Sequence, residues 1–298
     1  MNQLPKIIVV GGTNASGKSG LGVELARKFN GEIISADSRQ VFRGFDLGSG
    51  KITPEEMKGV RHHLIDVCGA GDFFSMHDFQ RLAYEAIDDI LSRGKLPFIV
   101  GGTGLYIASV CDGYVMSDRT PDLAYRDELE KLETPELNRM LLEIVPDTDV
   151  DPKNRNRVMR ILEKIHDGDD YKPHNQPRYT SLKLGVSWPR EILKQRIDER
   201  LERRMREGMV DEVRNLLDAG ASTEFMYKLG LEYRFITQYI TGEIETEEEM
   251  CLQLGLAIKR FAKRQMTWFR REKDMHWLDM AGDPIAEASA KIQEFLNI

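Results

Sequence analysis

Apolar runs and helical repeats alternate along the first hundred residues of the chain. Short apolar runs at residues 6–10, 32–36 and 96–100 have the length of buried strands. Between them, apolar positions recur at helical spacing from Lys18 and over residues 76–92. Strands that alternate with helices are typical of a parallel sheet flanked by helices. We therefore predict an α/β fold for this part of the chain.

The pattern becomes helical after a polar break near residues 118–121. Apolar positions from 122 to about 166 recur at helical spacing, which predicts an all-α insertion domain. A turn-rich segment then leads to an apolar run at 182–187 that predicts a returning strand. The predicted domains are residues 1–117, the first part of the core; residues 118–178, the helical insertion; and residues 179–298, the completion of the core.

The last hundred residues are predicted to contain a long charged helix from Arg190, a helix over about 250–271, a short strand near 276–278 and a final helix. In the helix from Arg190, charges of opposite sign alternate at three- and four-residue spacing, which favours a solvated face with ion pairs. We interpret the acidic run at 243–249 as a solvated helix start.

The composition is that of an ordinary globular protein. The 298 residues are 41% hydrophobic with a formal net charge of −7, so the chain is long enough to bury a full core. It contains no apolar run of about 18 residues and no signal-peptide pattern at its start. We expect a cytoplasmic protein without membrane association. The three cysteines form no C-x-x-C pair, which argues against a disulfide framework or a zinc site.

The first strand leads directly into a phosphate-binding motif. Residues 12–19 read GTNASGKS, a complete match to G-x-x-x-x-G-K-[ST]. In such a loop, backbone N–H groups face a phosphate chain, Lys18 adds a positive charge, and the Ser19 hydroxyl can hold Mg²⁺. We predict a phosphate site formed by Gly12, Thr13, Asn14, Ala15, Ser16, Gly17, Lys18 and Ser19.

Polar residues follow two further strands of the predicted sheet. DSRQ at 37–40 and GGTGLY at 101–106 each come directly after an apolar run. In a parallel sheet these strand ends meet at one edge, where ligands bind. Two interpretations stay open for each position. Asp37 is either a general base or the cap of a helix that begins at Ser38, and Thr103 is either a site residue or a turn hydroxyl.

The strand at 96–100 ends without an acidic residue. A nucleotide hydrolase normally has an Asp there to orient magnesium, so simple ATP hydrolysis is disfavoured. Asp66, at the end of a short apolar pair, is a weak alternative for that role. His62 and His63 have no third ligand at a recognisable spacing, which argues against a metal site.

Two basic clusters indicate an anionic partner. Arg155, Arg157 and Arg160 lie together near the end of the insertion. Residues 251–275 contain seven basic and two acidic residues, a local net charge of +5, and the basic residues recur on neighbouring helical turns. Such a stripe suits a phosphate backbone, although a plainly solvated surface has the same pattern.

Six ordered segments resemble the tRNA dimethylallyltransferases, also called tRNA isopentenyltransferases, which alkylate the adenine next to the anticodon. The similarity covers nearly the whole chain, and the ordered set is specific. The segments are residues 12–19, 34–48 (beginning ISADS), 63–66 (HLID), 100–106 (VGGTGLY), 156–160 (NRVMR) and 262–270 (AKRQMTWFR).

The resemblance implies that the loop binds the diphosphate of dimethylallyl diphosphate, whose allyl group passes to the exocyclic amine of adenine. This amine is a poor nucleophile, so a carboxylate that accepts its proton helps the new bond to form. Asp37 matches the family's base, and Thr103 and Arg126 match positions that line the site. Lys18 and Mg²⁺ at Ser19 would stabilise the leaving diphosphate.

The resemblance also implies contacts with tRNA, whose target adenine must be flipped out of the anticodon loop. We expect tRNA and dimethylallyl diphosphate as the partners of a monomeric protein. The predicted tRNA-binding residues are Asp37, Ser38, Arg39, Gln40, Asn156, Arg157, Val158, Met159, Arg160, Lys228 and Gly230, together with Lys263 and Arg264 of the basic stripe.

The chain departs from the family pattern in three places. In the loop, Thr13 and Asn14 replace Pro-Thr. The segment 117–121 replaces a more proline-rich pattern, which makes Arg119 an alternative to Arg126 at the diphosphate. The stretch 228–233 (KLGLEY) lacks the usual Gly-Tyr pair.

Three other functions remain compatible with parts of the sequence. A small-molecule kinase would also use the phosphate loop and a carboxylate at the second strand end. A prenyltransferase acting on free adenine nucleotides would leave the basic clusters without RNA to bind. A non-catalytic RNA-binding module would leave the intact phosphate loop unexplained.

Overall fold

A computed structural model describes residues 4–116, 122–172 and 174–298. The chain forms two compact units, one that runs to Asp112 and resumes over Pro177–Ile298, and a second over Gly113–Gln176. Each unit has its own buried apolar residues.

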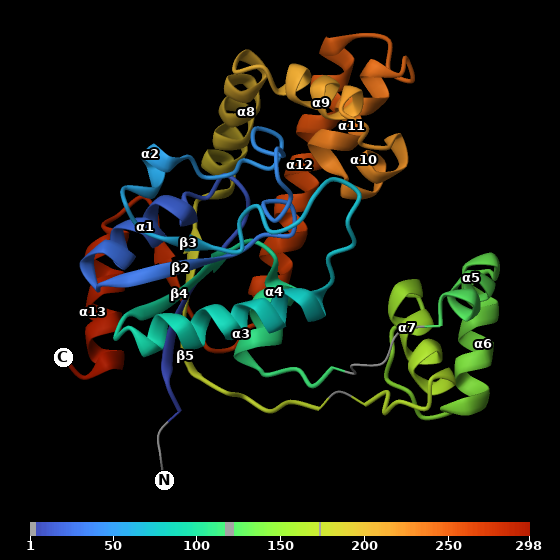
Figure 1. The fold of residues 1–298 in the computed structure, drawn as a ribbon, viewed down its shortest axis with the longest axis horizontal. Coiled ribbons are helices and arrows are strands. Elements are labelled where there is room, and N and C mark those ends of the chain that lie inside the picture. Colours follow the sequence, from blue (N-terminus) through green and yellow to red (C-terminus); the bar gives the residue numbers. More distant parts are fainter. Residues whose placement is uncertain (1–3, 117–121, 173) are drawn as a thin grey trace. The chain divides into compact units, whose positions relative to one another are not determined.

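The first unit is built on a six-stranded sheet in which every neighbouring pair of strands is parallel. The order β3-β2-β4-β1-β5-β6 places β1 between β4 and β5, so the phosphate-binding motif leaves the sheet near its centre (Figure 1). The strands are β1 Lys6–Gly11, β2 Gly31–Ala36, β3 His62–His63, β4 Leu96–Gly101, β5 Thr180–Ser187 and β6 Met275–Asp279.

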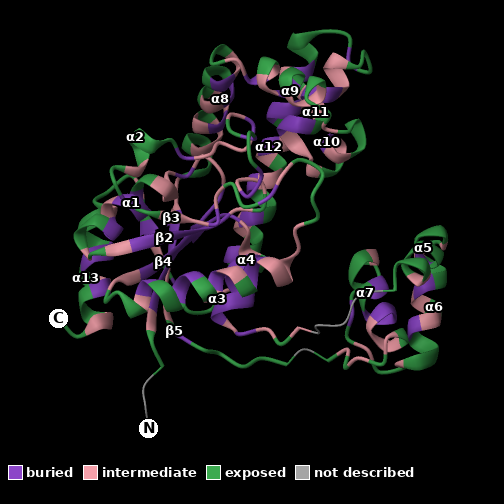
Figure 2. Ribbon diagram, viewed as in Figure 1, coloured by how far each residue is buried: buried purple, intermediate pink, exposed green. Residues whose placement is uncertain are grey.

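Helices cover both faces of this sheet because the side chains of β1 alternate between two apolar clusters. Ile7 and Val9 pack with residues of α3 (Met76–Ser92) and α4 (Gly104–Cys111). Ile8 and Val10 pack on the opposite face, with residues of α1 (Lys18–Lys28) and α13 (Pro284–Leu296). All four β1 side chains are fully buried, as the purple strands in Figure 2 show. Burial on two faces explains why this strand is a continuous apolar run.

A third apolar cluster joins the segment after β2 to a group of helices. Phe42 and Phe45 pack with Tyr233, and Phe45 lies edge-to-face against the Tyr233 ring at 5.0 Å between centroids. These helices border one side of the region beyond the carboxyl ends of the strands. The remaining elements of the first unit are α2 Pro54–Met57, α8 Arg190–Arg206, α9 Met209–Asp218, α10 Thr223–Leu229, α11 Leu231–Ile240 and α12 Glu247–Phe269.

The second unit contains the helices α5 Leu123–Lys131, α6 Thr134–Ile144 and α7 Arg155–His166. The side chains of Asp122 and Asn154 cap α5 and α7 by accepting backbone N–H bonds. An apolar cluster that includes Leu137 and Val158 forms its core. Such a core is what the helical repeat at 122–166 predicts.

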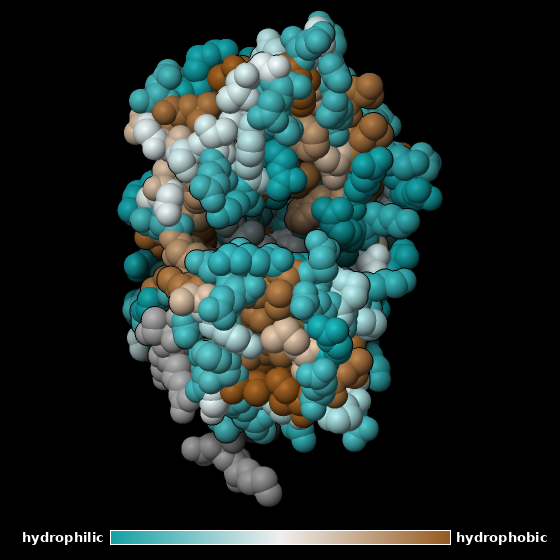
Figure 3. Space-filling model, turned by 90° about the vertical axis from the view of Figure 1, so that its right-hand side faces the viewer, coloured by the Kyte–Doolittle hydropathy of each residue, from teal (hydrophilic) through white to brown (hydrophobic). Residues whose placement is uncertain are grey.

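The predicted fold class, a parallel sheet flanked by helices with an all-α insertion, is confirmed. The helix predicted over residues 76–92 is α3, and the acidic run supplies the first turn of α12. On the face shown in Figure 3, hydrophilic side chains surround separate groups of hydrophobic ones. In the part of the chain that the structure describes, the helices are too short or too polar to cross a membrane.

Candidate functional site

The phosphate-binding motif folds as a tight loop between β1 and α1. Gly17 has a positive φ of 88°, and Ala15 adopts a left-handed conformation at φ 56°, which is unusual for a residue with a side chain. Gly12 lies where an added Cβ would come within 2.4 Å of Val186 Cγ2. The loop therefore needs glycine at two of its positions, and a left-handed alanine marks it as a candidate site.

Long-range hydrogen bonds hold this loop in place. The Trp188 indole donates to the Ser16 carbonyl at 2.9 Å, and Arg196 Nε donates to the Ala15 carbonyl at 3.0 Å. Within the loop, the Ser16 hydroxyl donates to the Thr13 carbonyl at 2.7 Å. Thr13 is itself buried, with 1% of the residue exposed.

Gln265 of α12 joins the loop to the end of β4. Its Oε1 accepts from the Asn14 backbone N–H at 2.9 Å, and its Nε2 donates to the Gly102 carbonyl at 3.0 Å. A Cβ at position 102 would lie 2.5 Å from Gln265 Nε2, so glycine permits this approach. Sequence reasoning assigned Gln265 no role, because its two partners are distant along the chain.

The structure brings Asp37 and Thr103 together at the ends of the neighbouring strands β2 and β4. Asp37 Oδ1 accepts from the Arg39 backbone N–H at 2.9 Å. The Thr103 hydroxyl accepts from the Ser38 N–H at 3.2 Å, and the Thr103 N–H donates to the Ala36 carbonyl at 3.1 Å. Asp37 therefore caps a turn, because the segment after it is not helical. The alternative that it caps a helix from Ser38 is wrong.

A cavity of about 340 Å³ opens between the loop, this turn and the helices α8, α11 and α12. Its size is within the range of small-molecule sites. Cationic side chains outnumber acidic ones on its walls, which favours a ligand that carries several negative charges. The ionisable residues that line it are Lys18, Arg39, Arg196, Arg200, Arg203 and Arg204, with Asp37, Glu56, Glu199 and Glu232.

Three arginines of α8 occur at four-residue spacing, so they lie on one face of the helix. Arg196, Arg200 and Arg204 all line the cavity, and Arg204 is only 8% exposed. The prediction that this helix presents only a solvated face with ion pairs is therefore wrong for this side. The sequence signal that could have revealed the stripe is its spacing of four, which the many other charges of α8 conceal.

Burial and mutual repulsion lower the pKa values of cations in this cavity. Burial lowers the pKa of Lys18 to about 8; Asp37 opposes this shift, and Arg200 and Arg204 add to it. Burial likewise lowers the pKa of Arg200 to about 9, with Arg204 as the next cause. A bound anion would relieve this repulsion. The electrostatics therefore favour a site that binds a polyanion.

The oxygen donors at the cavity fit a magnesium ion held mainly by its ligand. The side chains of Ser19 and Asp37 both line the cavity. Clusters of three or more His, Cys, Asp or Glu side chains that could hold a metal are absent among the described residues. Mg²⁺ is commonly held by one or two protein oxygens together with phosphates and water, so this sparse set suits it.

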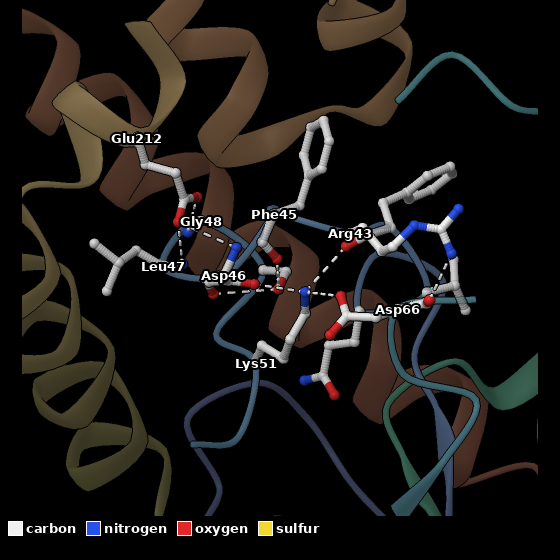
Figure 4. Close-up of polar contacts among 12 residues, drawn as sticks. Arg43, Phe45, Asp46, Leu47, Gly48, Lys51, Asp66 and Glu212 are labelled. Atoms are coloured by element: carbon white, nitrogen blue, oxygen red, sulfur yellow. Dashed lines mark hydrogen bonds and ion pairs between the residues drawn. The ribbon is translucent and has the colours of Figure 1, made fainter. Parts of the chain in front are cut away.

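The other metal-related residues make structural contacts. Lys51 Nζ lies between the carboxylates of Asp46 and Asp66, at 2.5 Å from each (Figure 4). The weak prediction that Asp66 orients magnesium is therefore wrong. His63 Nε2 contacts Glu32 Oε2 at 2.8 Å, and Glu32 also binds Arg93. This network packs beside the sheet edge. Among the described residues, it forms no group of three or more His, Cys, Asp or Glu side chains that could hold a metal ion.

Arg126, predicted to line the site, lies on α5 of the second unit. It forms ion pairs with Glu130 and Glu163, each at 3.3 Å. Arg119 and the rest of the altered segment 117–121 lie outside the described residues. The assignment of either arginine to the diphosphate stays a prediction.

Several predicted tRNA-binding residues point inward. Gln40 Oε1 accepts a hydrogen bond from the Ser35 hydroxyl, and Gln40 Nε2 donates one to the Gly50 carbonyl. Arg39 Nε donates to the Leu229 carbonyl at 3.1 Å, and its guanidinium pairs with Glu232 at 3.6 Å. Both side chains shape the cavity wall.

Two of the five residues predicted to bind tRNA on α7 are part of the hydrophobic core. Val158 is 0% exposed and Met159 is 5% exposed, within the apolar cluster of the second unit. The helical period turns their side chains away from solvent, and their assignment to tRNA binding stays a prediction. Asn156, Arg157 and Arg160 are exposed on the same helix.

The remaining predicted RNA contacts lie on α10 to α12. Lys228 is exposed and pairs with Glu224 at 2.7 Å, and Gly230, at φ 78°, forms the junction between α10 and α11. Lys263 and Arg264 are exposed on α12. They line a groove of about 470 Å³ that also contains Arg260, Thr267, Trp268 and Arg271.

The parallel sheet, the phosphate loop at its centre and the cationic cavity beside Asp37 define a P-loop α/β protein whose cavity suits a polyanionic ligand. The family model described as IPP transferase matches residues 40–272 of this chain. The chain belongs to this family, and the predictions of the family and of an enzyme are confirmed.

Relatives match over almost their whole length. "tRNA dimethylallyltransferase 2" of Citrifermentans bemidjiense is 41% identical, with 96% of this chain and 94% of that protein covered. The protein of the same name from Shewanella sediminis is 45% identical, with 97% of each chain covered.

Solved structures agree with the sequence comparison. The full-length tRNA isopentenylpyrophosphate transferase of Bacillus halodurans is 37% identical, with a TM-score of 0.75 over 98% of this chain and 95% of that one. A eukaryotic dimethylallyltransferase acting on tRNA is 26% identical, with a TM-score of 0.84 over 98% of this chain and 80% of that one.

Proposed function

We propose that this chain transfers a dimethylallyl group from dimethylallyl diphosphate to N6 of the adenosine next to the anticodon in tRNA, and releases diphosphate. The family and the names of its relatives support this reaction. The observation that carries it in this chain is the position of the Asp37 carboxylate on the wall of a cavity that the phosphate loop and the arginines of α8 also line.

In the proposed reaction, the adenine N6 attacks C1 of the allyl group while the bond from C1 to the diphosphate oxygen breaks. The electron pair of that bond leaves with diphosphate, and the Asp37 carboxylate accepts the N6 proton. Asp37 suits this role because one backbone hydrogen bond orients it, and its remaining acceptor sites are available to a ligand.

The cavity supplies positive charge where the leaving group would accumulate negative charge. We assign the diphosphate to the backbone N–H groups of residues 12–19 and to the ammonium group of Lys18, since such preorganised donors lower the barrier most where charge develops. Thr103 supports the turn that carries Asp37 through its bond from Ser38. Arg126 is proposed to line the site.

Mg²⁺ would be held by the Ser19 hydroxyl and would neutralise charge on the departing diphosphate. The second unit is proposed to be the tRNA-contacting insertion domain, through exposed Asn156, Arg157 and Arg160. Because its proposed acceptor is tRNA, we place the protein in the cytoplasm, and we propose that it acts as a monomer.

The test is to incubate the protein with unmodified tRNA, magnesium and labelled dimethylallyl diphosphate, with AMP as a parallel acceptor, and to analyse the nucleosides by mass. We expect one adenosine in tRNA to gain a dimethylallyl group and AMP to stay unchanged. Transfer to AMP would instead favour an enzyme of free nucleotides. Absence of transfer to either acceptor, together with ATP turnover, would favour a kinase and overturn the proposal. The Asp37→Asn variant provides the matched control.

A further inference from the structure

Arg204 is a buried cation whose hydrogen-bonding capacity is almost unused. Its side chain is 9% exposed, and its nearest carboxylate oxygen, Oε1 of Glu232, lies 3.7 Å from Nη1. The two groups form an ion pair, but the distance between them is too long for a hydrogen bond. A guanidinium carries five N–H donors, and among the described residues none of those of Arg204 has a hydrogen-bond acceptor. Arg204 nevertheless lines the cavity.

Gly50 makes this placement possible. A Cβ at position 50 would lie 1.4 Å from Arg204 Nη2 and 2.0 Å from Arg200 Nη2. Gly50 also has a positive φ of 64°, which disfavours any other residue. Its carbonyl accepts from Gln40 at 3.2 Å and from Arg200 at 3.4 Å. The absence of a side chain at this turn therefore allows two guanidinium groups to reach the cavity.

Glu232 balances only part of this charge. It is 5% exposed and pairs with Arg204 at 3.7 Å and with Arg39 at 3.6 Å. Its Oε2 has no hydrogen-bond partner. One carboxylate is thus shared between two arginines, with Arg200 nearby. Buried cations in excess of their counter-ions are costly unless a ligand completes the site.

We propose that Arg204 forms a second anion subsite in this cavity, one that binds the terminal phosphate of a diphosphate while the loop and Lys18 bind the other phosphate. This inference rests on the proposed function, because it assigns the diphosphate of that donor to two separate groups of residues. Arg204 thereby selects a diphosphate over a single phosphate.

Two observations favour a diphosphate over an RNA phosphate at this position. Arg204 and Lys18 line the same cavity. Arg204 is also almost fully buried, whereas the exposed arginines of α12 are accessible to a polymer. A phosphate in an RNA chain carries one charge and two ester links, so it suits the surface better than an enclosed subsite.

The test measures binding of inorganic diphosphate and of inorganic phosphate to the full-length protein by calorimetry, with magnesium present. Arg204→Met removes the charge and retains most of the volume. We expect it to weaken diphosphate binding about 10- to 100-fold, as the loss of a charged hydrogen bond implies, and to change phosphate binding less than about threefold. Arg206→Met, on the exposed side of the same helix, should leave both affinities unchanged.

A mutational cycle tests the role of Gly50. Gly50→Ala should weaken diphosphate binding in the parent protein, because the new Cβ displaces the Arg204 guanidinium. In an Arg204→Met background the same substitution should cost clearly less. Because Arg204→Met removes one of the two arginines that pair with Glu232 and leaves Arg39, the double variant Arg204→Met, Glu232→Gln provides a second test in which one charge of each sign is removed. Thermal unfolding of each variant establishes that it is folded.

Unchanged diphosphate affinity in the folded Arg204 variants would overturn the proposal. An equal loss of affinity for phosphate and for diphosphate would also overturn it. That result would mean that Arg204 adds positive potential to the whole cavity and does not form a separate subsite. These measurements need neither tRNA nor a prenyl donor. A protein that binds diphosphate through Arg204 but transfers no prenyl group would therefore contradict only the proposed function.

Discussion

The carboxylate of Asp37 accepts a hydrogen bond from the backbone N–H of Arg39, with 2.9 Å between Oδ1 and N. The guanidinium of the same arginine pairs with Glu232 on α11 at 3.6 Å. The residue proposed as the base is therefore attached, through Arg39, to the wall that carries the anion-binding arginines. An oriented carboxylate with unused acceptor sites suits proton transfer better than a freely rotating one.

We expect Asp37→Ala to reduce the rate of prenyl transfer about 10²- to 10⁴-fold, the usual contribution of a positioned base. The affinity for tRNA should change less than about threefold. Single-turnover rates at saturating substrate, with filter binding of tRNA in parallel, separate the two effects. Asp37→Asn keeps an oxygen for the Arg39 bond and should be nearly as slow. If both variants lose rate and affinity to the same extent, Asp37 is not the base.

Lys18 should make the stability of the free protein depend on pH. Its pKa is lowered to about 8 from 10.5 by burial, with Asp37 opposing the shift. Between these values the unfolded chain holds a proton that the folded chain lacks, so the contribution of this group to the free energy of unfolding rises with pH. Below pH 8 both states are protonated and its contribution is constant.

Urea denaturation of the parent protein and of Lys18→Met from pH 7 to 10 checks this expectation. The variant should be the more stable at pH 7, relative to the parent, and its advantage should shrink as the pH rises above 8. Parallel stability curves would show that Lys18 is not destabilised by burial.

Glu212 should stabilise the loop that carries Gly50. Its carboxylate accepts three consecutive backbone N–H groups, those of Asp46, Leu47 and Gly48, at 3.1, 2.6 and 3.0 Å (Figure 4), and the Tyr233 hydroxyl at 3.2 Å. Hydrogen bonds to a charged group are stronger than neutral ones, so we expect Glu212→Ala to lower the free energy of unfolding by about 2–4 kcal/mol.

Chemical denaturation measures this loss, and Asp211→Ala is the matched control. Asp211 is 73% exposed and pairs only with Arg214 on the same helix, so its removal should change stability by about 0.5 kcal/mol or less. An equal loss in the two variants would mean that the backbone contacts of Glu212 contribute nothing beyond a surface charge.

Replacement of Lys263 and Arg264 by glutamine should weaken tRNA binding and reduce its salt dependence. Each phosphate contact that is lost should lower the slope of log affinity against log salt by about 0.7–0.9. Binding to tRNAs of different sequence should weaken about equally, because backbone contacts carry no sequence information. Lys291→Gln, on α13 beside Glu294, is the control, and an unchanged slope in the double variant would exclude α12 from the RNA interface.

The elements that could be predicted from the sequence are those whose causes are local. The loop at residues 12–19 is predicted by its motif, in which Gly17 occupies a position of positive φ. The helix α3 begins where Ser75 and Asp78 form a capping box, and its predicted range equals the observed one. Burial on two faces made β1 readable as a continuous apolar run. In each case the deciding contacts join residues that are near one another in the chain, or depend only on periodicity.

The charge of the cavity depends on contacts between residues that are distant along the chain. Gly50 and Arg204 are 154 positions apart, and the close approach of the Arg204 side chain explains why glycine is needed at this turn. The stripe on α8 looked solvated because periodicity reports which residues share a face, and not what that face meets. Val158 and Met159 show the converse, because the segment NRVMR includes residues that the helical period turns into the core. Long-range packing determines which of two equally periodic faces is buried, and a single sequence does not contain that pairing.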